Sequence, residues 1–140
     1  MDNTKITKKR TKDTKERIEF DDLSRQVIGC ALDVHNALGP GLLESTYTQC
    51  LAQDLKQAGI PVALEVPVKV EYKGLDINCG YRIDMLVGNT LIVELKSIER
   101  FQPVHEAQIL TYMRLARVKT GLLINFNTKK LRDGIRRYVH

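Results

Sequence analysis

Two spacings of apolar residues divide the first half of the chain into segments. From Phe20 to Leu38, and again from Leu43 to Leu55, apolar residues recur every three or four positions, as in helices with one buried face. Gly39–Gly41 separates these two segments, and Gly59 ends the second. From residue 61 to 72, apolar residues instead alternate with polar ones, which predicts a strand with one buried face.

The second half of the chain predicts three further strands and two further helices. In order, these are a strand over Leu75–Val87 interrupted near Cys79–Gly80, a strand over Thr90–Lys96, a helix over Val104–Ala116, a strand over Gly121–Phe126 and an amphipathic helix over Lys129–Val139. The Gly121–Phe126 strand is almost wholly apolar and is expected in the sheet interior. Pro67 cannot donate a hydrogen bond, so its strand is expected at an edge or a bulge. This order predicts an α/β sandwich in which helices flank a mixed sheet of about four strands.

Composition narrows the class of protein. The 140 residues are 43% hydrophobic and 28% charged, which is ordinary for one soluble domain. No apolar run approaches the roughly 20 residues that span a membrane, and the start of the chain lacks the apolar stretch of a secretory signal. Cys30, Cys50 and Cys79 are odd in number and lack metal-type spacing, so we expect free thiols and a cytoplasmic location.

The positive charge is unevenly distributed. The net charge is +5, and residues 1–17 contribute most of it, with seven basic and three acidic residues. The rest of the chain is nearly neutral. We therefore expect a basic flexible tail over residues 1–19 and a folded domain over residues 20–140. The tail either stays solvated or adds a salt-sensitive attraction to phosphate.

Opposite charges stand together at the end of the Thr90–Lys96 strand. Alternation places Ile92, Glu94 and Lys96 on one face of this strand. If Asp84 of the preceding strand meets Glu94, the two carboxylates repel each other and favour a bound cation. Oxygen ligands suit Mg²⁺ or Mn²⁺, and Lys96 would add a positive charge beside a phosphate.

The turn between the two strands decides whether these carboxylates meet. A two-residue turn at Gly88–Asn89 places Asp84 opposite Val93, whereas a three-residue loop places it opposite Glu94. In the first case the charged residues are an ordinary solvated face, and in the second they form a candidate metal site. Spacing alone leaves both alternatives open.

Several motifs resemble a known superfamily. Asp84 and Glu94-Leu95-Lys96, after a helix that bears Glu44, resemble the PD-(D/E)XK nuclease superfamily. The segment HNALGPGLLESTY (35–47) is more specifically similar to the GxxExxY protein family, whose naming residues correspond to Gly41, Glu44 and Tyr47. The segments VELKSIERFQPVHEAQILTYMRLA and GLLINFNTKKLRDGIRRYV also fit that family. The resemblance covers about residues 22–140 and implies a restriction-endonuclease-like α/β sandwich.

The resemblance also implies a role for each residue of the motif. Asp84 and Glu94 correspond to the metal-binding acids, and Leu95 would contribute its backbone carbonyl. Lys96 corresponds to the catalytic lysine, and Glu44 to a helix acid that contacts the metal through water. The implied reaction is Mg²⁺- or Mn²⁺-dependent hydrolysis of phosphodiester bonds, with DNA as the expected substrate. The proline that often precedes the first acid is replaced by Ile83 in this chain.

Residues on the helices complete the implied site. Gln108 and Tyr112 resemble the QxxxY element of exonuclease-type members, which helps to hold substrate and the lysine. Tyr47 either hydrogen-bonds Glu44 or phosphate, or lies in the core. His35 is expected to cap or pack against the Gly39–Gly41 turn, while Asn125 has no assigned role.

A second class of function remains beside the nuclease. The same fold can serve as a non-catalytic module that binds nucleic acid or protein, because a fold alone does not confer activity. A domain of this size offers little groove, so sequence-specific recognition would need a homodimer or a protein partner.

Overall fold

The computed structural model describes the backbone of residues 14–140 and the side chains of residues 22–140. The elements are α1 (Thr14–Leu38), α2 (Glu44–Gln57), β2 (Val62–Pro67), β3 (Val70–Tyr72), β4 (Leu75–Ile77), β5 (Arg82–Val87), β6 (Leu91–Lys96), α3 (Pro103–Ala116), β7 (Thr120–Asn125), a 3-10 helix (Leu131–Gly134) and β8 (Ile135–Val139). The main sheet has the order β2-β5-β6-β7-β8. β6 and β7 pair in parallel, and the other neighbours pair antiparallel. The predicted α/β sandwich with a mixed sheet is confirmed, with five strands instead of about four.

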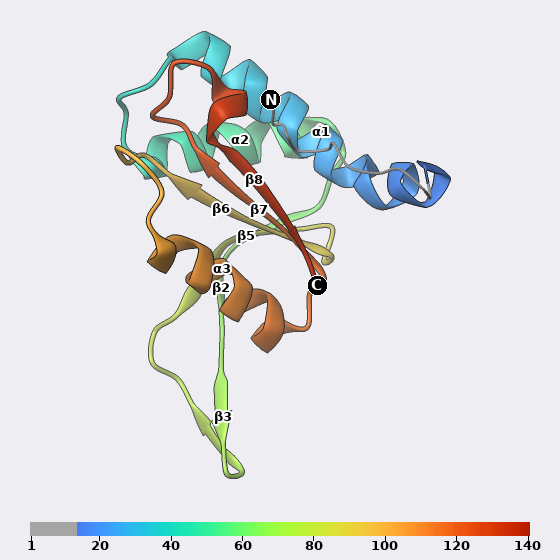
Figure 1. Cartoon of the computed structure of the whole chain (residues 1–140), viewed down its shortest axis with the longest axis vertical. Helices are drawn as coiled ribbons and strands as arrows, with labels where there is room; N and C mark the ends of the chain where they lie inside the picture. The colour runs from blue at the N-terminus through green and yellow to red at the C-terminus, as the bar shows by residue number, and fades with distance from the viewer. Residues whose placement is uncertain (1–13) are drawn as a thin grey trace.

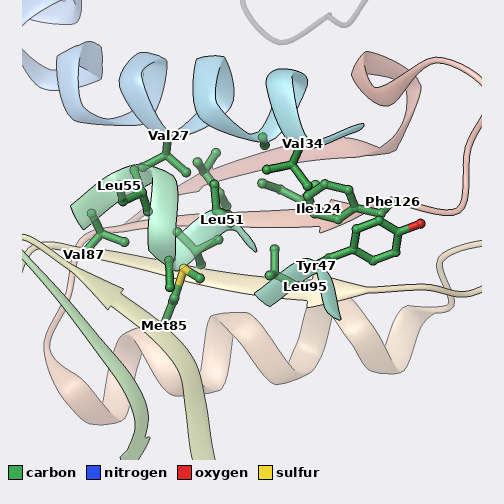
Figure 2. Packing of buried hydrophobic residues seen from close by; sticks show 14 of the residues in the cluster. Val27, Val34, Tyr47, Leu51, Leu55, Met85, Val87, Leu95, Ile124 and Phe126 are labelled. Atoms are coloured by element: carbon green, nitrogen blue, oxygen red, sulfur yellow. The ribbon is translucent and has the colours of Figure 1, made fainter. Parts of the chain in front are cut away.

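Helices cover both faces of this sheet. α1 and α2 lie on one face and α3 on the other (Figure 1). Under α1 and α2, side chains such as Val27 and Leu51 pack against Met85 and Leu95 of the strands (Figure 2). A smaller core lies between α3 and the opposite face of the sheet. The hairpin of β3 and β4 forms a separate two-stranded sheet that projects away from the main body (Figure 1).

β6 occupies the middle of the sheet and contributes to both cores. Leu91, Val93 and Leu95 lie in the core under α1 and α2, whereas Ile92 lies in the core under α3. Glu94 shares the face of Ile92, because residues two apart in a strand point the same way. The predicted division of this strand into two faces is therefore confirmed, and its charged face lies on the α3 side.

The predicted helix over Lys129–Val139 is wrong. This segment forms the 3-10 helix and then β8, which pairs antiparallel with β7 from Val139↔Thr120 to Ile135↔Ile124. Pairing with β8 satisfies the outer backbone groups of β7, which would otherwise form an apolar edge. At Gly134, where the 3-10 helix ends, an added Cβ would collide with the carbonyl oxygen of Asn125, so the close approach of the two segments requires glycine.

Other boundaries agree more closely with the sequence. The predicted strand over residues 61–72 is divided into β2 and β3, and Pro67 ends β2 at an edge of the sheet, as expected. The predicted interruption near Cys79–Gly80 separates β4 from β5. β7 is buried throughout and lies between β6 and β8, which confirms its interior position.

The start of the first helix differs from the expectation. α1 begins at Thr14, ahead of the expected start at Phe20, and no glycine or proline interrupts the intervening residues. Residues 1–13 of the predicted tail lie outside the described residues. No helix in the described part of the chain is both long and apolar enough to span a membrane.

Candidate active site

Asp84 and Glu94 lie side by side where β5 and β6 end their regular pairing. The β5–β6 ladder pairs Val87 with Leu91 and Met85 with Val93, which is the register of the three-residue loop. At the next position, the N–H of Asp84 donates to Oε2 of Glu94 over 2.9 Å. The N–H of Leu95 donates to Oδ2 of Asp84 over 3.0 Å. The alternative in which these residues form a solvated face is wrong, because Glu94 is only 3% exposed.

The surroundings of the pair favour a bound proton or cation. Burial, followed by the charge of Asp84, raises the pKa of Glu94 to about 8. Burial also raises the pKa of Asp84, against the opposing effects of the Leu95 N–H and the charge of Lys96. Two partly buried carboxylates this close cannot both carry a full negative charge cheaply. Glu94 therefore retains its proton more readily than an ordinary glutamate does.

Lys96 and two residues of α3 form a chain of polar groups beside this pair. Nζ of Lys96 donates to Oε1 of Gln108 over 3.3 Å. Nε2 of Gln108 in turn donates to the hydroxyl oxygen of Tyr112 over 3.3 Å. Gln108 and Tyr112 are four residues apart on α3, so both lie on the same side of the helix. Burial, followed by the charge of Glu94, raises the pKa of Tyr112.

Glu44, the first residue of α2, is placed at the same end of the sheet. Its Oε2 accepts a hydrogen bond from the N–H of Ser97, the residue that follows β6, over 3.3 Å. Its charge contributes to the raised pKa of Asp84, so Glu44 acts electrostatically on that acid. Within the described residues, no three His, Cys, Asp or Glu side chains are grouped closely enough to hold a metal. Asp84 and Glu94 are therefore the candidate carboxylate ligands, and Glu44 does not form a group of three with them.

Tyr47 and His35 make contacts that hold neighbouring loops. The hydroxyl of Tyr47 donates to the carbonyl oxygen of Gly39 and accepts from the N–H of Leu42 over 3.1 Å. Its ring is buried and stacks on Phe126 at a centroid distance of 4.4 Å (Figure 2). The core alternative for Tyr47 thus holds, because its hydroxyl contacts the loop before α2. His35 contacts two loops. Its backbone carbonyl accepts a hydrogen bond from the N–H of Gly39 over 2.8 Å, and its Nε2 lies 2.8 Å from the carbonyl oxygen of Thr128.

Two residues of the site region were not recognised from the sequence. Ser97 connects the end of β6 to α2 through its N–H and through its hydroxyl, which donates to the carbonyl oxygen of Leu42 over 2.6 Å. Asn125 ends β7 and is buried, with its side chain bonded to the loop that follows β6. The only sequence signal for Asn125 was a polar residue at the end of an apolar strand.

Comparison with known proteins gives one family. Residues 21–138 match the PD-(D/E)XK nuclease superfamily. No curated protein and no solved structure gives a significant match. The three helices around a five-stranded mixed sheet are consistent with the restriction-endonuclease-like fold of that superfamily, and the match spans nearly all of the described residues. The chain belongs to the PD-(D/E)XK nuclease superfamily.

Proposed function

We propose that the protein is a nuclease that hydrolyses phosphodiester bonds of DNA with the help of a divalent metal. The observation that carries this proposal is the pairing of Asp84 with Glu94, with the ammonium group of Lys96 on the same strand end. Membership of the superfamily supports nucleic acid as the class of substrate. A cytoplasmic location is part of the proposal and is supported by the odd number of cysteines.

The donor set suits a hard divalent cation. Asp84 and Glu94 would hold Mg²⁺ or Mn²⁺ through their carboxylate oxygens, together with the backbone carbonyl of Leu95. The raised pKa of Glu94 supports this assignment, since a cation would replace the proton that the pair otherwise retains. Such an ion supplies charge neutralisation at the scissile phosphate and lowers the pKa of a bound water.

The remaining residues act on the substrate and its surroundings. Lys96 places a positive charge where negative charge develops on the phosphate, and Gln108 holds its ammonium group in place. Tyr112 supports Gln108 from the next turn of α3. Glu44 is exposed at the edge of the site and can bind a water molecule there.

We also assign the chain to the GxxExxY family within the superfamily. The conformations and contacts of the three naming residues support this assignment. Gly41 adopts a φ of 100°, a conformation that favours glycine, in the turn before α2. Tyr47 bonds that loop from inside the core, and Glu44 begins α2 facing Ser97. The motif thus presents one acid to the site and uses the other two residues to shape the loop.

The direct test is cleavage of labelled single- and double-stranded DNA and RNA with Mg²⁺ or Mn²⁺. We expect the wild-type protein to cut DNA, and Asp84→Asn and Lys96→Met to reduce the rate by roughly 100-fold or more. Asp33→Asn and Lys69→Met change exposed charges elsewhere and should leave the rate unchanged.

Three results would contradict the proposal. Equal cleavage by the wild type and both site variants would show a contaminating nuclease. Metal-dependent binding of DNA or of a protein without any cleavage would instead show a non-catalytic binding module. Cleavage of RNA but not of DNA would overturn the proposed substrate.

A further inference from the structure

Asn125 holds the loop that follows the lysine strand. It is paired with Lys96 in the parallel register of β6 and β7, and it is only 3% exposed. Its Oδ1 accepts from the N–H of Ile98 over 3.0 Å, and its Nδ2 donates to the carbonyl oxygen of Ile98 over 2.9 Å. A side chain thus continues the strand pairing after the last backbone hydrogen bond, from the N–H of Phe126 to the carbonyl oxygen of Lys96.

The segment Ser97–Ile98, which Asn125 holds, also contacts Glu44. Ile98 is joined directly to Ser97, whose N–H donates to Oε2 of Glu44. The hydroxyl of Ser97 also donates to the carbonyl oxygen of Leu42, two residues before Glu44. One short segment is therefore held by β7 on one side and holds the start of α2 on the other. Because Glu44 is exposed, packing alone does not fix its carboxylate.

We infer that Asn125 is a positioning residue that fixes Ser97–Ile98 and, through the N–H of Ser97, orients Glu44 toward the Asp84–Glu94 pair. The importance of this orientation for catalysis rests on the proposed nuclease function. The amide group suits the task because it offers one acceptor and one donor to the two backbone groups of Ile98. An aspartate would keep the acceptor but would place a negative oxygen against the Ile98 carbonyl.

The first test uses the metal-free full-length protein and nuclear magnetic resonance. In the wild-type background, Glu44→Gln should shift the amide signal of Ser97, because the acceptor of its hydrogen bond changes. In the Asn125→Asp background, the same Glu44→Gln change should shift that signal by less than about one third as much. Asn89→Asp adds the same charge at an exposed position in the turn before β6, at the other end of that strand, and should preserve the full response. An undiminished response of Ser97 in Asn125→Asp would overturn the inference.

The second test measures Mn²⁺ affinity by calorimetry in a double-mutant cycle. We expect Asn125→Asp and Glu44→Gln each to weaken binding by about threefold to tenfold, and the double variant to be no weaker than the weaker single variant. Independent effects, in which the two factors multiply, would show that Asn125 does not act through Glu44 and would overturn the inference. If Asn125→Asp does not fold, Asn125→Ser introduces no charge and is measured in the same two experiments.

The two tests separate this inference from the proposed function. The response of the Ser97 amide requires neither metal nor substrate. A coupled response of Ser97 in a protein that neither binds Mn²⁺ nor cleaves DNA would overturn the nuclease proposal and confirm the positioning of Glu44. An uncoupled response in a protein that cleaves DNA would overturn the positioning of Glu44 and leave the nuclease proposal standing.

Discussion

Asp84 and Glu94 interact through backbone N–H groups as well as through their side chains. The N–H of Asp84 donates to the Glu94 carboxylate, and the N–H of Leu95 donates to the Asp84 carboxylate. These two hydrogen bonds take the place of the next step in the β5–β6 ladder, which is regular as far as Met85↔Val93. One oxygen of each acid is thereby held by an N–H, so both carboxylates are oriented before any cation binds.

Removing one of these charges should stabilise the metal-free protein. Asp84→Asn keeps an oxygen for the Leu95 N–H but removes the charge that helps to raise the pKa of Glu94. We expect the free energy of unfolding in urea with EDTA at pH 8 to rise by about 1 kcal/mol. Mn²⁺ affinity measured by calorimetry should fall at least tenfold. The exposed control Asp33→Asn should change neither quantity, and a less stable Asp84→Asn would contradict the repulsion between the acids.

The stability of the metal-free protein should fall as the pH rises. The pKa of Glu94 is raised from its ordinary value of 4.5 to about 8, so the folded state binds this proton more tightly than the unfolded state. The contribution of Glu94 to the free energy of unfolding is therefore fully present below about pH 4.5. It is lost as the pH rises from there to about 8. The slope for one proton is at most about 1.4 kcal/mol per pH unit.

Urea unfolding at several pH values in EDTA measures this slope. Glu94→Gln should flatten the curve between pH 5 and pH 8, because its side chain does not titrate. Mg²⁺ should stabilise the wild type most at the upper end of this range, where the carboxylates have lost their protons. An equal slope in the wild type and in Glu94→Gln would show that another group controls the pH dependence.

Substitutions of Tyr47 and Glu44, two residues of the GxxExxY motif, should have different effects. The first should lower stability, and the second should lower activity. Tyr47→Phe removes the hydroxyl that bonds Gly39 and Leu42 but keeps the ring stacked on Phe126. We expect it to lower the free energy of unfolding by about 1–2 kcal/mol. Glu44→Gln should leave that free energy within about 0.5 kcal/mol and lower kcat roughly tenfold.

Chemical unfolding and steady-state cleavage kinetics distinguish these two effects. Activity should be expressed per folded molecule, at a temperature well below the Tm of both variants. If Tyr47→Phe lost as much kcat as Glu44→Gln while remaining fully folded, Tyr47 would act on the substrate and not only on the loop.

Gly134 should tolerate no side chain, whereas Gly29 should accept one. An alanine Cβ at Gly134 would collide with the carbonyl oxygen of Asn125, a backbone atom that cannot move freely. We expect Gly134→Ala to cost about 2–4 kcal/mol of stability. Gly29 lies inside α1 with open space around it, so Gly29→Ala should gain roughly 0.5–1 kcal/mol. Urea unfolding of the two variants measures both values, and equal effects would refute the close approach at Gly134.

The pattern of apolar residues predicted the structure correctly where it depends on a single segment of the chain. Alternation along Leu91–Lys96 correctly divided β6 between two cores, and the apolar stretch from Gly121 correctly predicted an interior strand. The same reasoning failed for Lys129–Val139, because a short segment with apolar residues every three or four positions also fits a strand next to an unpaired neighbour. There, the backbone hydrogen bonds offered by β7 outweighed the helical pattern.

The candidate site also combines features that the sequence predicts with features that depend on the tertiary structure. The residue types of Asp84, Glu94 and Lys96, and their resemblance to the superfamily motif, are properties of the sequence alone. Their meeting depended on a three-residue loop that the sequence left undecided, since a register shift of one residue would turn Asp84 away from Glu94. Glu44 and Asn125 reach β6 from distant parts of the chain, so only the tertiary structure could place them.

The sequence by itself determined the alternating faces, the buried strand and the charged groups available for chemistry, because these follow from side-chain type and spacing. Tertiary structure decided the register of β5 on β6, the fifth strand and the connection from Asn125 through Ser97 to Glu44. The physical reason is that backbone pairing between segments distant in sequence depends on which partner edge is open, and that is settled only when the sheet is assembled.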